Sequence, residues 1–105
     1  GSDFPIESPD PRRGIHAAIT RQDEHGHPPG GFLPAERLDA LQALRGFTVG
    51  AARAAFAEGE AGRIAPGMRA DFTVLDVDPL EVEPRRILGA RILRTIVGGR
   101  TVFAA

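Results

Sequence analysis

The hydrophobic pattern changes its period near residue 60, and this change limits the folds open to the chain. Before it, Leu38, Leu41 and Leu44 recur every three residues, which is typical of a helix. After it, β-branched and aromatic residues gather in short runs separated by glycine and proline. The pattern therefore predicts an α+β fold, with helices plus a small antiparallel sheet. At 105 residues the chain is too short for a complete (β/α)8 barrel, which needs about 200 residues or more.

Capping residues mark where two helices begin. Asp10 is a candidate N-cap and Pro11 suits the first helical position, so a short helix is predicted over residues 11–20. Asp39, followed three residues later by Gln42, forms a variant of the capping box. That pair predicts a second helix starting at Asp39.

The second helix is expected to break and then resume. Gly46 interrupts it, and Thr48 is predicted to cap a further helix that runs to about Phe56 and stops at Gly59. Small side chains on this further helix would let a neighbouring element approach closely. The residues on that face are Phe47, Ala51, Ala54 and Ala55.

Three strands are predicted in the second half of the chain. The run at residues 72–77 has apolar residues on both parities, which indicates a strand covered on both faces. Gly98 and Gly99 separate the runs 91–97 and 100–103. Two adjacent glycines favour a hairpin with a type I′ turn, because that turn needs positive φ at both positions.

Few titratable residues outside these elements point to chemistry. Asp3, between a serine and a proline-containing turn, could ligate a metal or act as a general base, or be only a turn residue. His25 and His27 resemble a metal-binding pair, but they lie in the polar loop 22–31, where solvated histidines are the favoured interpretation. His16 is expected to be a half-exposed packing residue on the first helix.

Composition excludes several classes of function. The chain has 13 basic residues, all arginine, and 14 acidic residues. It therefore lacks the excess of positive charge that binding to nucleic acid or to an anionic membrane favours. Cysteine and lysine are absent, which excludes disulfides, thiolate nucleophiles and Schiff-base lysines. No apolar run approaches the roughly 20 residues of a membrane span, and no signal peptide is visible. A cytoplasmic location is therefore expected.

Several motifs resemble one enzyme family. Residues 62–76, GRIAPGMRADFTVLD, resemble the carboxy-terminal signature of the metal-dependent amidohydrolase superfamily, in which a Pro-Gly turn and an Ala-Asp pair lead into a strand. Residues 43–52, ALRGFTVGAA, are similar to the helix before that signature, and residues 95–102, TIVGGRTV, to the closing hairpin. The opening residues 1–21 are similar to the amidohydrolase-3 branch, which includes formamide-deformylase-like enzymes.

The resemblance implies that the chain is a C-terminal fragment of such an enzyme. Residues 1–59 would be the end of a (β/α)8 barrel, and residues 60–105 the C-terminal strands of a β-sandwich built from both chain ends. Members of the family hydrolyse a C–N, amide-type bond of a small molecule with a metal-activated water. Asp3 matches the family's aspartate that binds the metal and takes a proton from that water, and the expected ion is divalent, zinc foremost.

The same resemblance limits what the isolated chain is expected to do. The family's other metal ligands have no counterpart here, and one carboxylate is fewer than the roughly three protein ligands of a catalytic zinc. The isolated chain is therefore expected to hold no metal and to be inactive. Its apolar faces are expected to associate with the missing N-terminal part of the enzyme or with further copies of the chain.

Two other interpretations stay open. The chain could be a non-enzymatic assembly or packing module, binding no metal and associating through Leu38, Leu41 and Leu44. It could also be a small metal binder that joins Asp3 to His25 and His27, which requires the loop to fold back onto the first turn. Metal content and self-association distinguish these interpretations from the hydrolase.

Overall fold

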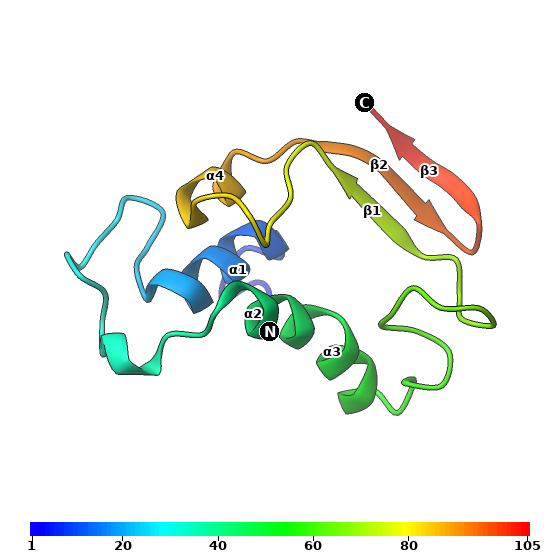
Figure 1. The fold of residues 1–105 in the computed structure, drawn as a ribbon, viewed down its shortest axis with the longest axis horizontal. Helices are drawn as coiled ribbons and strands as arrows, with labels where there is room; N and C mark the ends of the chain where they lie inside the picture. Colours follow the sequence, from blue (N-terminus) through cyan, green and yellow to red (C-terminus); the bar gives the residue numbers. More distant parts are fainter.

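The computed structural model describes residues 1–105 and contains a group of helices beside a three-stranded sheet (Figure 1). The sheet is antiparallel with the order β1-β2-β3, which confirms the predicted α+β class. In chain order the elements are α1 (Pro11–Thr20), the 3₁₀ turn η1 (Pro34–Glu36), α2 (Ala40–Phe47), α3 (Val49–Ala54), β1 (Phe72–Leu75), α4 (Pro84–Leu88), β2 (Ile92–Val97) and β3 (Arg100–Ala104).

A small apolar core holds α1 against both α2 and α4. Its buried centre consists of Ile15 from α1, Ala43 from α2 and Ile87 from α4. Leu44 packs against this centre, whereas Leu38 and Leu41 of the same leucine series are 42% and 46% exposed. The core therefore joins a residue of the second half of the chain, Ile87, to the helices of the first half.

The sheet extends away from the helices rather than packing on them (Figure 1). Every residue of β3 is exposed, and in β1 the apolar Val74 is 42% exposed. The prediction that β1 is covered on both faces is therefore wrong within this chain. Val74 is exposed and the apolar residues at the two ends of β1, Phe72 and Leu75, are only half-buried, so no second layer covers the strand.

The predicted helix starts are confirmed. Asp10 accepts a hydrogen bond from the backbone N–H of Arg12 at 3.0 Å, and Pro11 occupies the first turn of α1. At the start of α2 the capping box is complete: Asp39 accepts from the N–H of Gln42 at 2.7 Å, and the Gln42 side chain accepts from the N–H of Asp39 at 2.9 Å. Both starts are fixed by residues within three positions of each other, which a sequence reveals directly.

The predicted break between the helices lies elsewhere. Gly46 does not interrupt α2, which continues to Phe47 and breaks at Thr48. The Thr48 hydroxyl donates back to the carbonyl of Leu44 at 2.8 Å, so its side chain does not cap α3 as predicted. The hydroxyl is used by the end of one helix and is therefore unavailable to the start of the next.

The buried face of α3 also differs from the prediction. α3 ends at Ala54, two residues short of Phe56, and its buried residue is Ala52, whereas Ala51 and Ala55 are exposed. Ala52 faces Gly62, whose φ is +95°. A Cβ on Gly62 would lie 2.8 Å from the Ala52 Cβ, so glycine is required both by the backbone angle and by the close approach.

The hairpin between β2 and β3 forms as predicted. Gly98 and Gly99 have φ of +56° and +78°, the left-handed values that the type I′ turn requires. The turn is tied to the start of β1, because the Gly98 N–H donates to the Asp71 carboxylate at 2.7 Å and the Gly99 N–H donates to the Ala70 carbonyl at 2.9 Å. The Ala-Asp pair of the signature thus holds the hairpin in place.

The helix α4 was not predicted from the sequence. It has five residues and begins with Pro84 in its first turn, a signal that in isolation is weak. Asp76, just after β1, links this region to β2: its carboxylate accepts from the N–H of Arg91 at 2.8 Å and from the Arg91 guanidinium at 2.9 Å. These bonds end β1 two residues before the predicted Val77.

We expect opposite effects from alanine at two glycines. Gly62→Ala places a Cβ against Ala52 at a positive φ and should lower the free energy of unfolding by about 1–3 kcal/mol. In Gly46→Ala the added Cβ meets no atom within 4 Å, and alanine favours the helix α2 more than glycine does. This variant should raise the free energy of unfolding by about 0.5–1 kcal/mol. Denaturant titration of both variants checks this, and equal effects would contradict the packing of Gly62 on α3.

Candidate functional site

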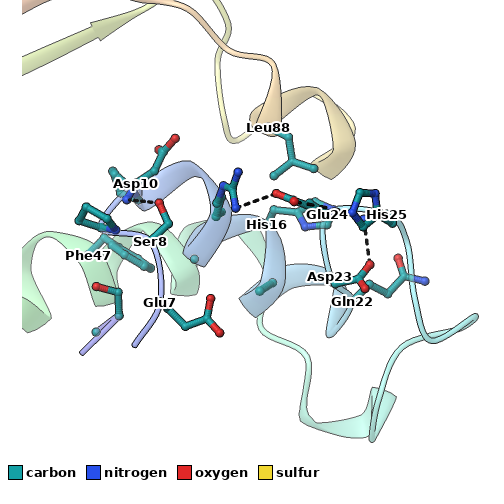
Figure 2. Close-up of a pocket in the computed structure, with 17 residues that line it drawn as sticks. Glu7, Ser8, Asp10, His16, Gln22, Asp23, Glu24, His25, Phe47 and Leu88 are labelled. Carbon is teal, nitrogen blue, oxygen red and sulfur yellow. Dashed lines mark hydrogen bonds and ion pairs between the residues drawn. The ribbon is translucent and has the colours of Figure 1, made fainter. Parts of the chain in front are cut away.

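A solvent-open cavity of about 670 Å³ lies along α1 (Figure 2). One wall comes from the segment before α1, which includes Ser2 and Glu7, and another from the loop after it, residues 22–25. Between them, α1 contributes Arg13 and His16. The volume falls within the range of about 300–1,000 Å³ that is usual for small-molecule pockets, so this is the chain's candidate binding site.

Asp3 does not line this cavity. It is exposed, with a φ of +50°, in a turn where its carbonyl accepts from the N–H of Ile6 at 2.9 Å. The same turn brings Glu7 to Ser2, with the N–H of Glu7 donating to the Ser2 carbonyl at 3.2 Å. The base of the turn thus borders the cavity, while Asp3 occupies its outer part and makes no side-chain hydrogen bond or ion pair within the chain.

The loop after α1 has a fixed base built on Arg21. The backbone N–H of Phe32 donates to the Arg21 carbonyl at 2.9 Å, and the Arg21 guanidinium donates to the Phe32 carbonyl at 3.0 Å. The guanidinium also lies 5.7 Å from the centre of the Phe32 ring, within cation–π range. Arg21 thus anchors the base of the loop, and it sets where residues 22–25 meet the cavity.

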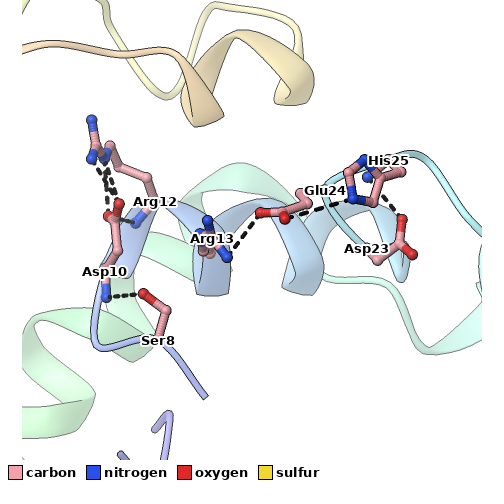
Figure 3. Close-up of polar contacts among 7 residues, drawn as sticks. All are labelled: Ser8, Asp10, Arg12, Arg13, Asp23, Glu24 and His25. Atoms are coloured by element: carbon pink, nitrogen blue, oxygen red, sulfur yellow. Dashed lines mark hydrogen bonds and ion pairs between the residues drawn. The ribbon is translucent and has the colours of Figure 1, made fainter.

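A tight turn inside this loop is organised by Asp23 (Figure 3). Its carboxylate accepts from the backbone N–H groups of His25 and His27 at 2.8 and 3.0 Å. These two amides, the His27 one most, lower the pKa of Asp23. The two histidines therefore stabilise the turn through their backbone N–H groups. Both side chains are exposed, which agrees with the prediction that they are solvated loop residues.

Ion pairs connect α1 to its surroundings (Figure 3). Arg13 pairs with Glu24 of the loop at 2.9 Å, and Glu24 lies 3.7 Å from the His25 ring. At the start of α1, Arg12 pairs with Asp10 at 2.7 Å and donates to the Ala90 carbonyl just after α4. The Arg12 side-chain hydrogen bond is the main cause that lowers the pKa of Asp10.

His16 is buried rather than half-exposed as predicted. Only 4% of it is exposed, although its side chain lines the cavity (Figure 2). Burial lowers the pKa of His16, and the positive charge of Arg85 lowers it further, while Asp23 acts in the opposite direction. The sequence shows a lone histidine on a helix and a polar loop after it, but it gives no sign that this loop and α4 together enclose the histidine.

The structure does not assemble a metal site from the sequence candidates. No group of three or more histidine, aspartate or glutamate side chains lies close enough together to hold a metal ion. Asp3, His25 and His27 therefore do not form the site that the interpretation as a small metal binder required. The chain offers individual donors, of which Asp3 is the one singled out by its sequence position.

Comparison with known proteins decides the family. A model of the amidohydrolase family matches residues 1–103, nearly the whole chain. This chain belongs to the amidohydrolase family. The resemblance read from the opening residues, the signature and the closing hairpin is thereby confirmed.

Individual amidohydrolase relatives are similar over the same length. YtcJ of Bacillus subtilis (strain 168), which is named as an amidohydrolase, is 36% identical over 103 residues, covering 98% of this chain and 20% of its own. The N-substituted formamide deformylase of Arthrobacter pascens is 34% identical, covering 93% of this chain and 18% of its own. The protein LONG AFTER FAR-RED 3 of Arabidopsis thaliana is 34% identical, covering 98% and 17%.

The chain thus spans about a fifth of the length of the curated relatives it matches. No solved structure matches it. None of its helices combines the length and the apolar character that crossing a membrane requires.

The Asp10–Arg12 pair should make stability depend on pH in acid. Because the folded pKa of Asp10 is lowered, its contribution is present above the unfolded pKa of about 3.9 and is lost as the pH falls through the folded pKa. Asp10→Asn keeps a good N-cap but removes the charge, so its deficit in unfolding free energy should be present at pH 7 and vanish in strong acid. Urea titrations from pH 7 down to pH 2 measure this, and a deficit independent of pH would contradict it.

Proposed function

We propose that this chain is the C-terminal part of a metal-dependent amidohydrolase that hydrolyses a C–N, amide-type bond with a metal-activated water. The observation that carries the proposal is the family match over residues 1–103. The resemblance of the opening residues to the family implies that Asp3 is its metal-binding aspartate. In this view residues 1–59 complete the end of a barrel and residues 60–105 complete a sandwich. The name of the Arthrobacter pascens relative makes an N-substituted formamide the first substrate to try.

The residues of this chain do not fit a complete metal site. No cluster of three donors exists, and Asp3 supplies one ligand where a catalytic zinc takes about three. The remaining ligands would come from other parts of the protein. A divalent metal, zinc foremost, would acidify a bound water when the whole set is assembled.

The role proposed for Asp3 is the handling of one proton. In hydrolysis the oxygen of water bonds to the carbonyl carbon, the C–N bond breaks, and an acid and an amine are released. The Asp3 carboxylate would accept the proton that the water loses, and the leaving nitrogen would gain one. Asp3 suits this role because its carboxylate has no hydrogen-bond or ion-pair partner within the chain.

Replacing Asp3 tests the proposal in the full-length protein. Asp3→Ala should lower the release of amine from an N-substituted formamide by about 100-fold or more, because both a ligand and a proton acceptor are lost. The thermal unfolding midpoint should stay within a degree or two, because the side chain makes no contact that holds the fold.

A matched variant controls for the loss of a negative charge. Glu58→Gln removes an exposed carboxylate that likewise has no hydrogen bond or ion pair, and it should leave both turnover and bound metal unchanged. Turnover retained by Asp3→Ala would remove Asp3 from the reaction. Absence of metal and of amide hydrolysis in the unaltered protein would remove the whole proposal.

The surface of the chain favours a second, non-enzymatic role in assembly. Its accessible surface is 7611 Å², whereas a complete domain of this mass exposes about 5,700 Å². The excess of about 1,900 Å² is larger than the roughly 800 Å² that one partner buries in a standard interface. Exposed apolar side chains account for much of it: Phe4 and Ile6 before α1, Phe56 and Ile64 between α3 and β1, and Val97, Val102 and Phe103 in the sheet.

This excess surface should make the isolated 105-residue chain self-associate. We expect sedimentation velocity at micromolar concentration to show dimers and larger species, because the sheet has two open edges and uncovered apolar side chains. Addition of the N-terminal remainder of the protein should convert these species to one complex. A strictly monomeric chain that unfolds cooperatively would contradict the association.

A further inference from the structure

A buried imidazole faces the cavity without a protein partner. His16 is 96% buried, yet its ring makes no hydrogen bond within the chain. The hydrogen bonds of this residue come from its backbone, whose carbonyl accepts from the Thr20 hydroxyl at 2.8 Å. Every side-chain nitrogen or oxygen of the chain that is shut off from solvent has a hydrogen-bond partner. The polar atoms of the His16 ring therefore keep their access to solvent, and the cavity they line provides it. Because buried polar groups are normally hydrogen-bonded, this ring is available to a ligand.

The protonation state of His16 defines what it can offer. Burial and the positive charge of Arg85 on α4 lower its pKa, and the loop carboxylate of Asp23 offsets only part of this. The ring is therefore mainly neutral at pH 7, starting from an ordinary value of about 6.5. A neutral imidazole has one nitrogen that accepts a hydrogen bond and one that donates.

Acceptors prevail among the other groups of the cavity. Arg13, the arginine that lines it, is already paired with Glu24, and Asp10 is paired with Arg12. Glu7, in the segment before α1, lines the cavity without an ion pair, and Asp23 accepts only from backbone N–H groups. The carboxylates of Glu7 and Asp23 thus remain without an ion pair, although the Arg85 guanidinium also acts on His16 from α4.

We propose that this cavity binds an organic ammonium group, with the unprotonated nitrogen of His16 accepting an N–H and the carboxylates of Glu7 and Asp23 balancing the charge. This inference rests on the proposed function, because hydrolysis of a C–N bond releases an amine that such a site could bind. The cavity would then hold the amine side of the substrate or product. Phe47 and Leu88 also line it and supply apolar surface for the substituent carried by the nitrogen.

Calorimetric titration of the full-length protein with n-butylammonium tests this at pH 7.5. We expect measurable binding, with 1-butanol, the neutral alcohol of the same chain length, binding at least about 10-fold more weakly. His16→Leu removes the ring nitrogens but leaves a side chain that can stay buried, and it should weaken the binding of n-butylammonium by about 10-fold. His16→Gln restores an acceptor and should recover part of this loss of affinity.

A second variant does not depend on the fold surviving at His16. Glu7→Gln changes an exposed side chain and should weaken the binding of n-butylammonium several-fold without affecting the binding of 1-butanol. Glu58→Gln should change neither affinity. Equal affinity for the charged and neutral probes, no binding of n-butylammonium, or unchanged binding in both Glu7→Gln and His16→Leu would overturn the proposal.

The two proposals can fail separately. Asp3→Ala should leave the affinity for n-butylammonium unchanged, because Asp3 does not line the cavity. Ammonium binding without amide hydrolysis would count against the proposed function alone. Hydrolysis of an N-substituted formamide by a protein that does not bind n-butylammonium would count against the cavity alone.

Discussion

The helical part of the chain depends on the contact of Ile15 with Ala43 and Ile87. This contact holds α1 between α2 and α4, and α1 in turn carries the side chains that face the cavity. Ile15 and His16 are consecutive residues, so the packing of one fixes the position of the other. Arg12 reinforces the arrangement by joining Asp10 at the start of α1 to the Ala90 carbonyl beyond α4. The geometry of the candidate site is thus a consequence of helix packing.

The core is nevertheless small for the apolar content of the chain. Hydrophobic residues make up 42% of the sequence, but five of them are buried. The radius of gyration, 14.5 Å, exceeds the roughly 13 Å of a complete domain of this length, because the sheet extends away from the helices. Burial on this scale contributes little against the conformational entropy of 105 ordered residues. The uncovered apolar side chains therefore support the proposal that these elements associate with further protein surface.

Local chemistry explains which features the sequence predicted. The Asp10 cap, the capping box of Asp39 and Gln42 and the glycine pair at 98 and 99 each depend on residues a few positions apart, and all three formed as predicted. The predictions failed where a distant residue decides the outcome. The side of α3 that is buried is set by Gly62, eight residues after that helix ends.

The candidate site shows the same division between local and distant effects. Its loop could be recognised from composition, and Asp3 from its motif, but neither pattern shows that His16 is covered. That burial requires the loop on one side and α4 on the other, and α4 has five residues, of which the sequence gives only a proline as a signal. A lone histidine on a helix becomes informative only when the elements that enclose it are known.

One short turn connects the two places where chemistry is proposed. Ser2 and Glu7 meet at its base, where they border the cavity, and Asp3 lies one residue beyond Ser2 on the outer part. A substrate reaching from Asp3 into the cavity would therefore cross this turn. Its reacting carbon would lie on the side of the exposed Phe4 and Ile6, and its nitrogen substituent would lie along α1. On this arrangement the chain contributes two different things to one reaction, a proton acceptor outside the cavity and a binding wall inside it. Substitutions along α1 should then change which amines are accepted, and substitution of Asp3 should change whether any are released.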